Sequence, residues 1–389
     1  MFIFPAKNGN IYLPEAKGFA INALFLGMAK KKNRQRFTSL LIITAILFGV
    51  IIIFSRSAAL SEWYMQHVYP AVAIILSMLS GVFPFSLYDL FIITALLYLI
   101  ILILFVITGK KGFKKFLYSL VRFVTMLVAW FYFAWGISYF REDFYAKSDV
   151  KETPFDAENL KKFVVRFIAD ANEAYVDIDV MDRAGVRQEL ERSYHALHGK
   201  LSIDYPNGKR RAKPMLFEPL YSKMGISGYF GPFFNEIHVN NYSLDITYPF
   251  TLAHEMAHQF GIAHESEANL YAFIVCLGSE DERIRYSAYL STLLYLVNDA
   301  AEFLPDEVDS LTSAIRPEII ADLRRNRKHW LAVRDRSLSE VQDRAYDAYL
   351  KTNKVSSGRD NYSEVVGLLI SSYDTFIKKS TAIPEAPAN

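Results

Sequence analysis

The chain has 389 residues, of which 52% are hydrophobic and 15% aromatic, and its formal net charge is only +2. This near-neutral balance argues against a nucleic-acid-binding protein, because such a protein needs a strongly basic face. The single cysteine, Cys276, excludes an internal disulfide framework and a cysteine-rich zinc site. About 250 residues remain after the most apolar segments are set aside, which is enough for a folded domain with its own core.

Three stretches near the N-terminus are apolar and long enough to cross a lipid bilayer. They lie at about 37–54, 90–108 and 116–140. The first two carry no charge, and the third carries Arg122 near its start, where the long side chain can reach the headgroups. The sequence therefore predicts a membrane domain over residues 37–140.

Basic residues flank these stretches and predict their orientation. One basic run covers 30–36, and another covers 110–115, between the second and third stretches. Because basic flanks mark the cytoplasmic side, three spans leave residues 1–36 in the cytoplasm and deliver residue 141 to the outer side. We therefore expect a multi-pass protein of the inner (cytoplasmic) membrane whose main domain is extracytoplasmic.

The apolar segment 69–85 is ambiguous, because Pro70, Gly81 and Pro84 lie near its ends. If it crossed the bilayer, the basic run at 110–115 would fall on the outer side. We therefore expect a re-entrant or interfacial helix at 69–85, with a fourth span as the alternative.

Residues 141–379 are predicted to form a mainly helical α+β domain with a small β-sheet, followed by a disordered tail at 380–389. An alternating strand at 235–240 is expected to form the edge of a cleft, with His238 facing solvent. A glycine- and aromatic-rich segment precedes it at 225–231. The other expected strands lie at 201–205 and 215–218, and the expected helices at 159–175, 186–198, 284–297, 317–330, 338–350 and 362–376.

The most informative motif is HExxH, formed by His254 to His258. Two histidines four residues apart share one face of a helix, where their imidazoles can hold a Zn²⁺ ion. Glu255 lies beside them, so its carboxylate can take a proton from an attacking water as a general base. The alternative is an ordinary helix with two hydrogen-bonded histidines. Gly261 and the acidic residues after it favour a metal site, because the helix must end there to bring in a third ligand.

Two residues compete as that third ligand. Glu267 lies in the first turn of the next predicted helix, and two histidines plus one glutamate are a common catalytic zinc set. His264 completes the pattern HExxHxxGxxH, which requires a methionine further along the chain. No methionine follows Met256. We therefore expect His254, His258 and Glu267 as zinc ligands, with His264 and Glu265 beside them as orienting groups.

The string HEMAHQ followed by Glu265 and the Glu-Ala-Asn of 267–269 resembles the ImmA/IrrE-like peptidase group. A closer resemblance, from about 37 to 373, is to the Domain of Unknown Function 3810 family. It includes Phe-Pro-Phe-Ser at 83–86, Gly-Ile-Ser-Gly-Tyr at 225–229 and Gly-Arg-Asp-Asn-Tyr-Ser at 358–363. This resemblance implies a bacterial membrane-anchored, zincin-like zinc metallopeptidase of unknown substrate.

Two functions remain open from the sequence. The first is a membrane-anchored zinc-dependent metallopeptidase that hydrolyses a peptide or an envelope or membrane protein, with Glu255 as the general base. The second is a non-hydrolytic zinc-binding sensor or structural protein, in which His264 and Glu267 both bind the ion and close its coordination.

Overall fold

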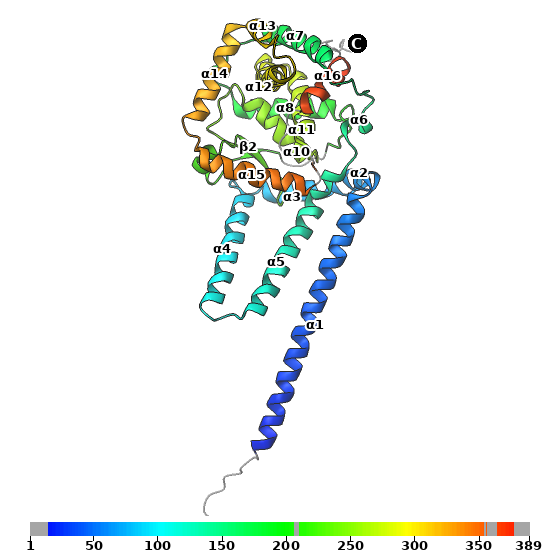
Figure 1. Cartoon of the computed structure of the whole chain (residues 1–389), viewed down its shortest axis with the longest axis vertical. Helices are drawn as coiled ribbons and strands as arrows, with labels where there is room; N and C mark the ends of the chain where they lie inside the picture. The colour runs from blue at the N-terminus through cyan, green and yellow to red at the C-terminus, as the bar shows by residue number, and fades with distance from the viewer. Residues whose placement is uncertain (1–14, 206–209, 354, 356–363, 377–389) are drawn as a thin grey trace, which may run out of the picture.

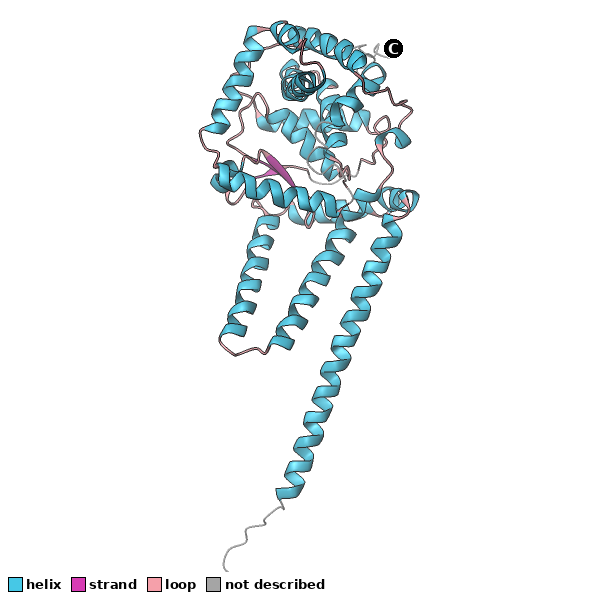
Figure 2. Cartoon of the chain, in the orientation of Figure 1, coloured by secondary structure: helices cyan, strands magenta, loops and turns pink. Residues whose placement is uncertain are grey.

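The computed structural model describes residues 15–205, 210–353, 355 and 364–376, with side chains from residue 35 onward. The expected tail at 380–389, the 358–363 motif and the first two residues of the predicted helix 362–376 lie outside these ranges. The described chain consists mainly of helices around a small sheet (Figure 2).

Three long helices extend from one side of the domain (Figure 1): α1 (Glu15–Ser55), α4 (Leu87–Ile107) and α5 (Phe113–Ala134). Among the described residues, the segments long and apolar enough to cross a membrane are Gln35–Ser55, α4 and α5. They match the three expected spans within a few residues. The third ends at Ala134 rather than at 140, because Trp135 departs from α-helical geometry (φ −164°, ψ −33°) and the chain continues as a short 3₁₀ helix, η1 (Gly136–Phe140).

Helices α2 (Ala58–His67) and α3 (Tyr69–Ser80) form a layer between these spans and the domain (Figure 1). Helix α3 has 12 residues and is therefore about 18 Å long, too short to cross a hydrocarbon core of about 30 Å. One face is buried through Tyr69, Val72 and Leu76, whereas Ile75 and Leu79 are exposed. The length of α3 argues against a fourth span over this segment, and its interfacial or re-entrant placement stays a prediction.

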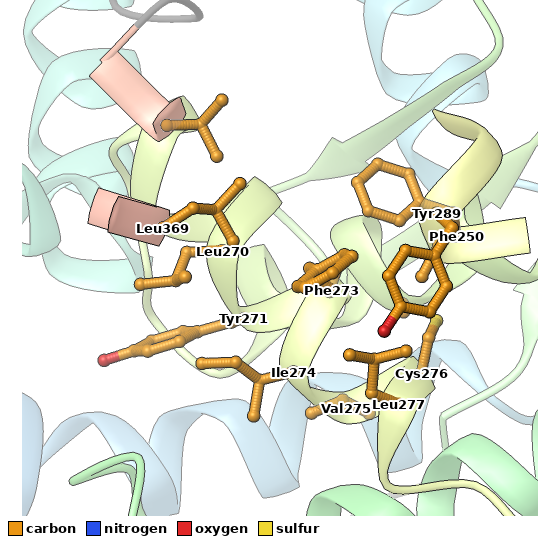
Figure 3. Close-up of a cluster of buried hydrophobic side chains, with 14 of the residues drawn as sticks. Phe250, Leu270, Tyr271, Phe273, Ile274, Val275, Cys276, Leu277, Tyr289 and Leu369 are labelled. Carbon is orange, nitrogen blue, oxygen red and sulfur yellow. The ribbon is translucent and has the colours of Figure 1, made fainter. Parts of the chain in front are cut away.

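Helix α11 (Glu265–Leu277) occupies the centre of the domain, and all of its residues are buried. Aromatic and aliphatic side chains from other helices pack around it, including Phe250, Tyr289 and Leu369 (Figure 3). The other domain helices are α6 (Phe144–Lys147), α7 (Ala157–Glu173), α8 (Arg183–Leu197), α9 (Glu218–Met224), α10 (Tyr248–Gln259), α12 (Glu282–Phe303), α13 (Val308–Ser313), α14 (Pro317–Leu331), α15 (Arg336–Thr352) and α16 (Glu364–Phe376).

Over the described residues, the sheet has three strands in the order β1-β3-β2: β1 (Ala212–Lys213), β2 (Gly228–Gly231) and β3 (Glu236–Val239). Strand β3 pairs parallel with β1 and antiparallel with β2. The expected strand at 235–240 is therefore central, and β2 forms an edge. His238 is fully buried, so the expectation that it faces solvent was wrong.

Two other predicted strands are not formed. In 201–205, Ser202 adopts a left-handed conformation (φ 50°), which interrupts an extended chain even though Leu201 and Ile203 are buried. In 215–218, the amide of Leu216 donates to the carboxylate of Asp89 at 2.7 Å instead of to a neighbouring strand. In 201–205 the apolar alternation therefore reflects burial of loop residues in the core, whereas in 215–218 Met215 is buried but Leu216 and Phe217 are exposed.

A cluster of buried polar residues, Asp89, Lys213, Glu236 and His238, joins the start of α4 to the sheet; we call it the polar joint. Glu236 accepts hydrogen bonds from the amides of Leu87 and Tyr88 in the first turn of α4, at 3.2 and 2.9 Å. Lys213 forms a close ion pair with Glu236. The joint fixes a candidate membrane span to the strand that lies beside the HExxH helix.

Candidate metal centre

The HExxH motif lies on α10, which packs against β3 and β2. Pro249 lies in the first turn, where its missing amide hydrogen costs nothing. The helix ends at Gln259, and Gly261 follows with a left-handed φ of 84°, a conformation that glycine adopts without strain. The chain then turns back into α11, which brings the first residues of that helix against the histidines.

The two motif histidines face one another. Nε2 of His254 lies 3.0 Å from Nε2 of His258. Nδ1 of His254 lies 2.9 Å from Oδ1 of Asn269, and Nδ1 of His258 lies 2.7 Å from the carbonyl oxygen of Ile262. Both Nδ1 partners are oxygen acceptors, so each Nδ1 carries the proton in a neutral ring and each Nε2 carries a lone pair.

Glu265 is the carboxylate that joins these nitrogens. Its Oε2 lies 3.1 Å from Nε2 of His254, and its Oε1 lies 3.6 Å from Nε2 of His258. Among the described residues, His254, His258 and Glu265 form a group whose ligand atoms all lie within 4.8 Å of one another. The hydroxyl of Tyr346, on α15, donates to Oε1 of Glu265 and holds the carboxylate in place.

Glu267, the third ligand expected from the sequence, is not brought to the histidines. Its Oε2 lies 3.1 Å from Nζ of Lys147, and both side chains are buried. Two positions along a helix differ by about 200° in direction, so Glu265 and Glu267 cannot share a face. The orienting role expected of Glu265 therefore changes to that of candidate ligand.

The unpaired atoms of this site fit a bound cation. Oε2 of Glu265 and Oε2 of Glu255 are both buried without a hydrogen-bond partner. The facing lone pairs of the two imidazoles repel one another unless a proton or a metal ion lies between them. Two nitrogens bound to one tetrahedral zinc ion lie about 3.3 Å apart, which is close to the separation seen here. Two imidazoles and a carboxylate are also a ligand set that zinc commonly accepts.

Glu255 lies beside this group and is 5% exposed. Burial raises the pKa of Glu255 to about 7, against the opposing effect of His254 and His258. Its carboxylate lies against Gly228 of β2, where an added Cβ would come within 2.6 Å of Oε1. The absence of a side chain at 228 is therefore what allows Glu255 to occupy this position.

Residues of α3 and of the segment around η1 hold the C-terminal end of α10. The indole of Trp135 donates to the carbonyl oxygen of His258 at 2.8 Å, and the hydroxyl of Tyr69 donates to that of Gln259 at 2.8 Å. Arg141 donates to the carbonyl oxygen of Gly261 at 3.2 Å while forming a buried ion pair with Glu62. These bonds satisfy carbonyl groups that a helix end leaves unpaired, and they tie the centre to α2, α3 and η1.

A cleft of about 1100 Å³ contains the three candidate ligands and Glu255. Residues 225–230, including the edge strand β2, form one wall, and α15 contributes another. Many of the side chains that line the cleft are aromatic, among them Phe131, Trp135 and Tyr349. Such a mainly apolar cleft with a few convergent polar groups is typical of a binding site.

A second candidate residue lies outside the site, and the sequence did not predict three residues that contribute to it. His264 lines a separate cavity and packs edge-on against Tyr139. The sequence reasoning did not assign roles to Tyr346, Asn269 or Gly228. The Glu-Ala-Asn string at 267–269 and the Gly-Ile-Ser-Gly-Tyr string at 225–229 were the available signals for the last two, whereas Tyr346 lies 81 residues from Glu265 and carries no local signal.

Comparison with known proteins identifies a family but no characterised relative. No curated protein and no solved structure matches the chain. The chain does match, over residues 64–370, the family described as "Protein of unknown function (DUF3810)". This range includes α3, two of the candidate spans and the HExxH motif. The chain therefore belongs to the Domain of Unknown Function 3810 family, as its sequence motifs indicated.

Proposed function

We propose that this protein is a membrane-anchored zinc metallopeptidase of zincin-like organisation, with His254, His258 and Glu265 as the metal ligands. The observation that carries the proposal is the convergence of two imidazole lone pairs and one orphaned carboxylate oxygen beside a second buried carboxylate. Three protein ligands leave a coordination position open, as in catalytic rather than structural zinc sites. The proposed cofactor is Zn²⁺.

Glu255 supplies the acid-base chemistry in this proposal. When bound, the zinc ion would act as a Lewis acid that polarises the scissile carbonyl and acidifies a water. Glu255 takes a proton from that water and donates it to the leaving amine. The C–N bond breaks, a C–O bond forms at the acyl carbon, and the water is consumed. Asn269 and the carbonyl of Ile262 keep the two imidazoles in the tautomer that binds metal.

The candidate spans and their basic flanks indicate on which side of the membrane the domain of the proposed enzyme lies. The loop between α4 and α5, with its lysines, lies at the end of these helices remote from the domain, as does the start of α1 (Figure 1). Basic flanks at this end favour a cytoplasmic location for it. We propose that the protein is a multi-pass protein of the inner membrane, that its domain is extracytoplasmic, and that it acts on peptides or on envelope or membrane proteins.

The alternative of a closed, non-hydrolytic zinc site has less support from the geometry. It requires His264 and Glu267 at the ion, but Glu267 is paired with Lys147 and His264 lines another cavity. In addition, a 1100 Å³ cleft reaches the three ligands. A site that only stabilises the fold needs no such access.

Metal content and hydrolysis tested on the purified full-length protein in lipid nanodiscs would decide between these functions. We expect stoichiometric zinc, together with cleavage of fluorescently labelled casein or of a labelled membrane-anchored peptide that phenanthroline abolishes and added zinc restores. A Glu267→Gln variant is the matched control and should behave like the wild type in both measurements. Stoichiometric zinc without cleavage of casein or of membrane-anchored peptides would contradict the peptidase proposal.

A further inference from the structure

The cleft that contains the metal centre extends to the candidate membrane spans. Besides the ligands, it is lined by Ile92 of α4 and by Leu127 and Val128 of α5. These two helices are apolar enough to cross a bilayer, and their domain-proximal ends stand apart (Figure 1). The cleft therefore has an end between two helices that would be surrounded by lipid.

The position of this end along the helices indicates its depth in a membrane. Ile92 lies five residues after the start of α4, about 8 Å along the helix axis, and Leu127 lies seven residues before the end of α5, about 10 Å. Partly exposed aromatic residues, among them Trp130 and Phe133, lie near the same level. Aromatic belts mark the interface between headgroups and hydrocarbon. The end of the cleft thus lies at the interface or just below it, in the leaflet next to the domain.

The lining changes character from this end to the other. The part contributed by α5 and the residue after it is apolar, with Phe131 and Trp135, whereas the α14–α15 region of the domain contributes the polar side chains Arg334, Gln342 and Asp343. A polypeptide that leaves a membrane helix passes from apolar to polar residues in the same order. The cleft therefore matches the polarity of a chain at the point where it emerges from a bilayer.

The edge strand favours a peptide over a lipid as the occupant. Residues 228–230 of β2 line the cleft, and β2 pairs with β3 on one side only among the described strands. Unpaired main-chain groups of an edge strand can bind an extended peptide by strand addition. An acyl chain has no groups to pair with them. Gly228 also places this edge directly against Glu255.

Resting on the peptidase function proposed above, we infer that the substrate is an extended segment next to a transmembrane helix of another membrane protein. It enters the cleft laterally, between α4 and α5, and pairs with β2, so that the scissile bond lies within a few residues of the membrane. Soluble peptides that lack a membrane anchor are then poor substrates.

The test uses the full-length protein in proteoliposomes with two pools of synthetic peptides. Each peptide in the first pool carries a polyleucine membrane helix followed by a degenerate, fluorophore-labelled extended segment, and the second pool has the same segments without the helix. Anchoring raises the effective concentration at the cleft, so anchored peptides should be cleaved about tenfold faster or more. Equal cleavage of both pools would overturn the lateral-entry inference while leaving the peptidase function intact. Absence of any cleavage would count against the peptidase function itself.

Substitutions in the cleft wall provide a second arm. Leu127→Trp fills the membrane end and should slow cleavage of anchored peptides by about tenfold, with unchanged zinc content. Val124→Trp is the matched control, because Val124 is on the same helix, is 46% exposed and does not line the cleft. Equal effects of the two substitutions would overturn the assignment of this entry path.

A crosslinking measurement is independent of turnover and covers the case in which Leu127→Trp impairs folding. The photoreactive residue p-benzoylphenylalanine replaces Leu127 or, as the control, Val124 in the Glu255→Gln protein. Adducts with the anchored peptides at 127 but not at 124 would support the inference. Adducts at 127 with phospholipid alone, unaffected by the anchored peptides, would overturn it in favour of a lipid occupant.

Discussion

Two buried polar clusters in this protein differ in whether a lysine or arginine side chain compensates their carboxylates. The polar joint holds Asp89 and Glu236 together with Lys213, whose ammonium group pairs with Glu236 and donates to the carbonyl of Ser80 at 2.6 Å. The metal cluster holds Glu255 and Glu265 with two histidines, and no described lysine or arginine pairs with either glutamate.

The carboxylates of the two clusters also differ in how many hydrogen bonds they accept. In the joint, Asp89 accepts from the amide of Leu216 and from the hydroxyls of Tyr221 and Tyr229, at 2.7, 3.0 and 2.5 Å. Each glutamate of the metal cluster instead keeps one buried oxygen without a partner. Burying a charge without compensation costs several kcal/mol, roughly. The joint is thus compensated by the chain itself, whereas the proposed function requires a cation to complete the compensation in the metal cluster.

The histidines show the same contrast. Burial lowers the pKa of His238 to about 4, so this ring stays neutral in the joint, with its Nε2 2.8 Å from Oγ of Ser86. The two motif histidines instead point their Nε2 atoms at one another and at Glu265. The group that faces Nε2 therefore distinguishes the two cases: a serine hydroxyl in His238, and another imidazole and a carboxylate in the two motif histidines.

The largest expected effect is the loss of metal in Glu265→Ala. Removing a direct ligand should weaken zinc binding by about a thousandfold, beyond the 10–100-fold typical of losing an outer hydrogen-bond partner. Zinc per purified protein, measured by mass spectrometry, checks this. The matched control is Glu267→Gln, two residues away, which keeps a polar partner for the buried Lys147 and should retain zinc. Loss of zinc from the Glu267 variant, with zinc retained in Glu265→Ala, would identify Glu267 as the third ligand and contradict the contrast between the two clusters.

In the joint, Lys213→Ala should destabilise the fold without affecting the metal. Removing one partner leaves the buried Glu236 uncompensated, at a cost of about 3–5 kcal/mol in the free energy of unfolding. Thermal unfolding in detergent measures this, with Arg336→Ala as the control because its pair with Glu340 is exposed and should contribute under about 1 kcal/mol. Zinc loss from well-folded Lys213→Ala protein would show that the two clusters are not independent.

Glu255→Gln separates chemistry from metal binding within the metal cluster. The amide has nearly the same shape but cannot accept the proton, so turnover should fall about a hundredfold or more while zinc stays bound. Hydrolysis rates and zinc content measured on the same preparation check this. Wild-type turnover in this variant would exclude Glu255 as the general base.

The smallest expected effect concerns Tyr346. Tyr346→Phe removes the hydroxyl that donates to Glu265 but leaves the ring in place. Loss of this outer partner should weaken zinc affinity about tenfold, at the low end of the usual range. Competition with a fluorescent zinc chelator measures the affinity, and Tyr349→Phe is the control on the same helix. Unchanged affinity in Tyr346→Phe would mean that Glu265 is held in place without this bond.

Local sequence patterns were sufficient to predict the spans, the HExxH helix and its end at Gly261. Each of these depends on residues close together along the chain: a run of apolar residues, a spacing of four on a helix, or a glycine that adopts a positive φ. The long helices of the domain were likewise predicted within a few residues. The two short strands that failed, at 201–205 and 215–218, had only a few apolar residues to support them, and loops contain such residues as well, whether buried like Ile203 or exposed like Leu216.

The choice between Glu265 and Glu267 was made only by the tertiary structure. Every face of α11 is buried, so its hydrophobic pattern carries no information about the rotation of the helix around its axis. That rotation is set by packing against several other helices, and it decides which glutamate meets the histidines and which meets Lys147.

The sequence by itself predicted three helices apolar enough to cross a membrane and a helix with two histidines on one face, because both signals are local. Only the tertiary structure decided what surrounds that helix. Tyr346 reaches Glu265 across 81 positions, and Lys213 meets Glu236 in the joint. The cleft continues between α4 and α5 because long-range packing places these spans beside β2. Such contacts depend on how the helices dock, and no local pattern encodes that.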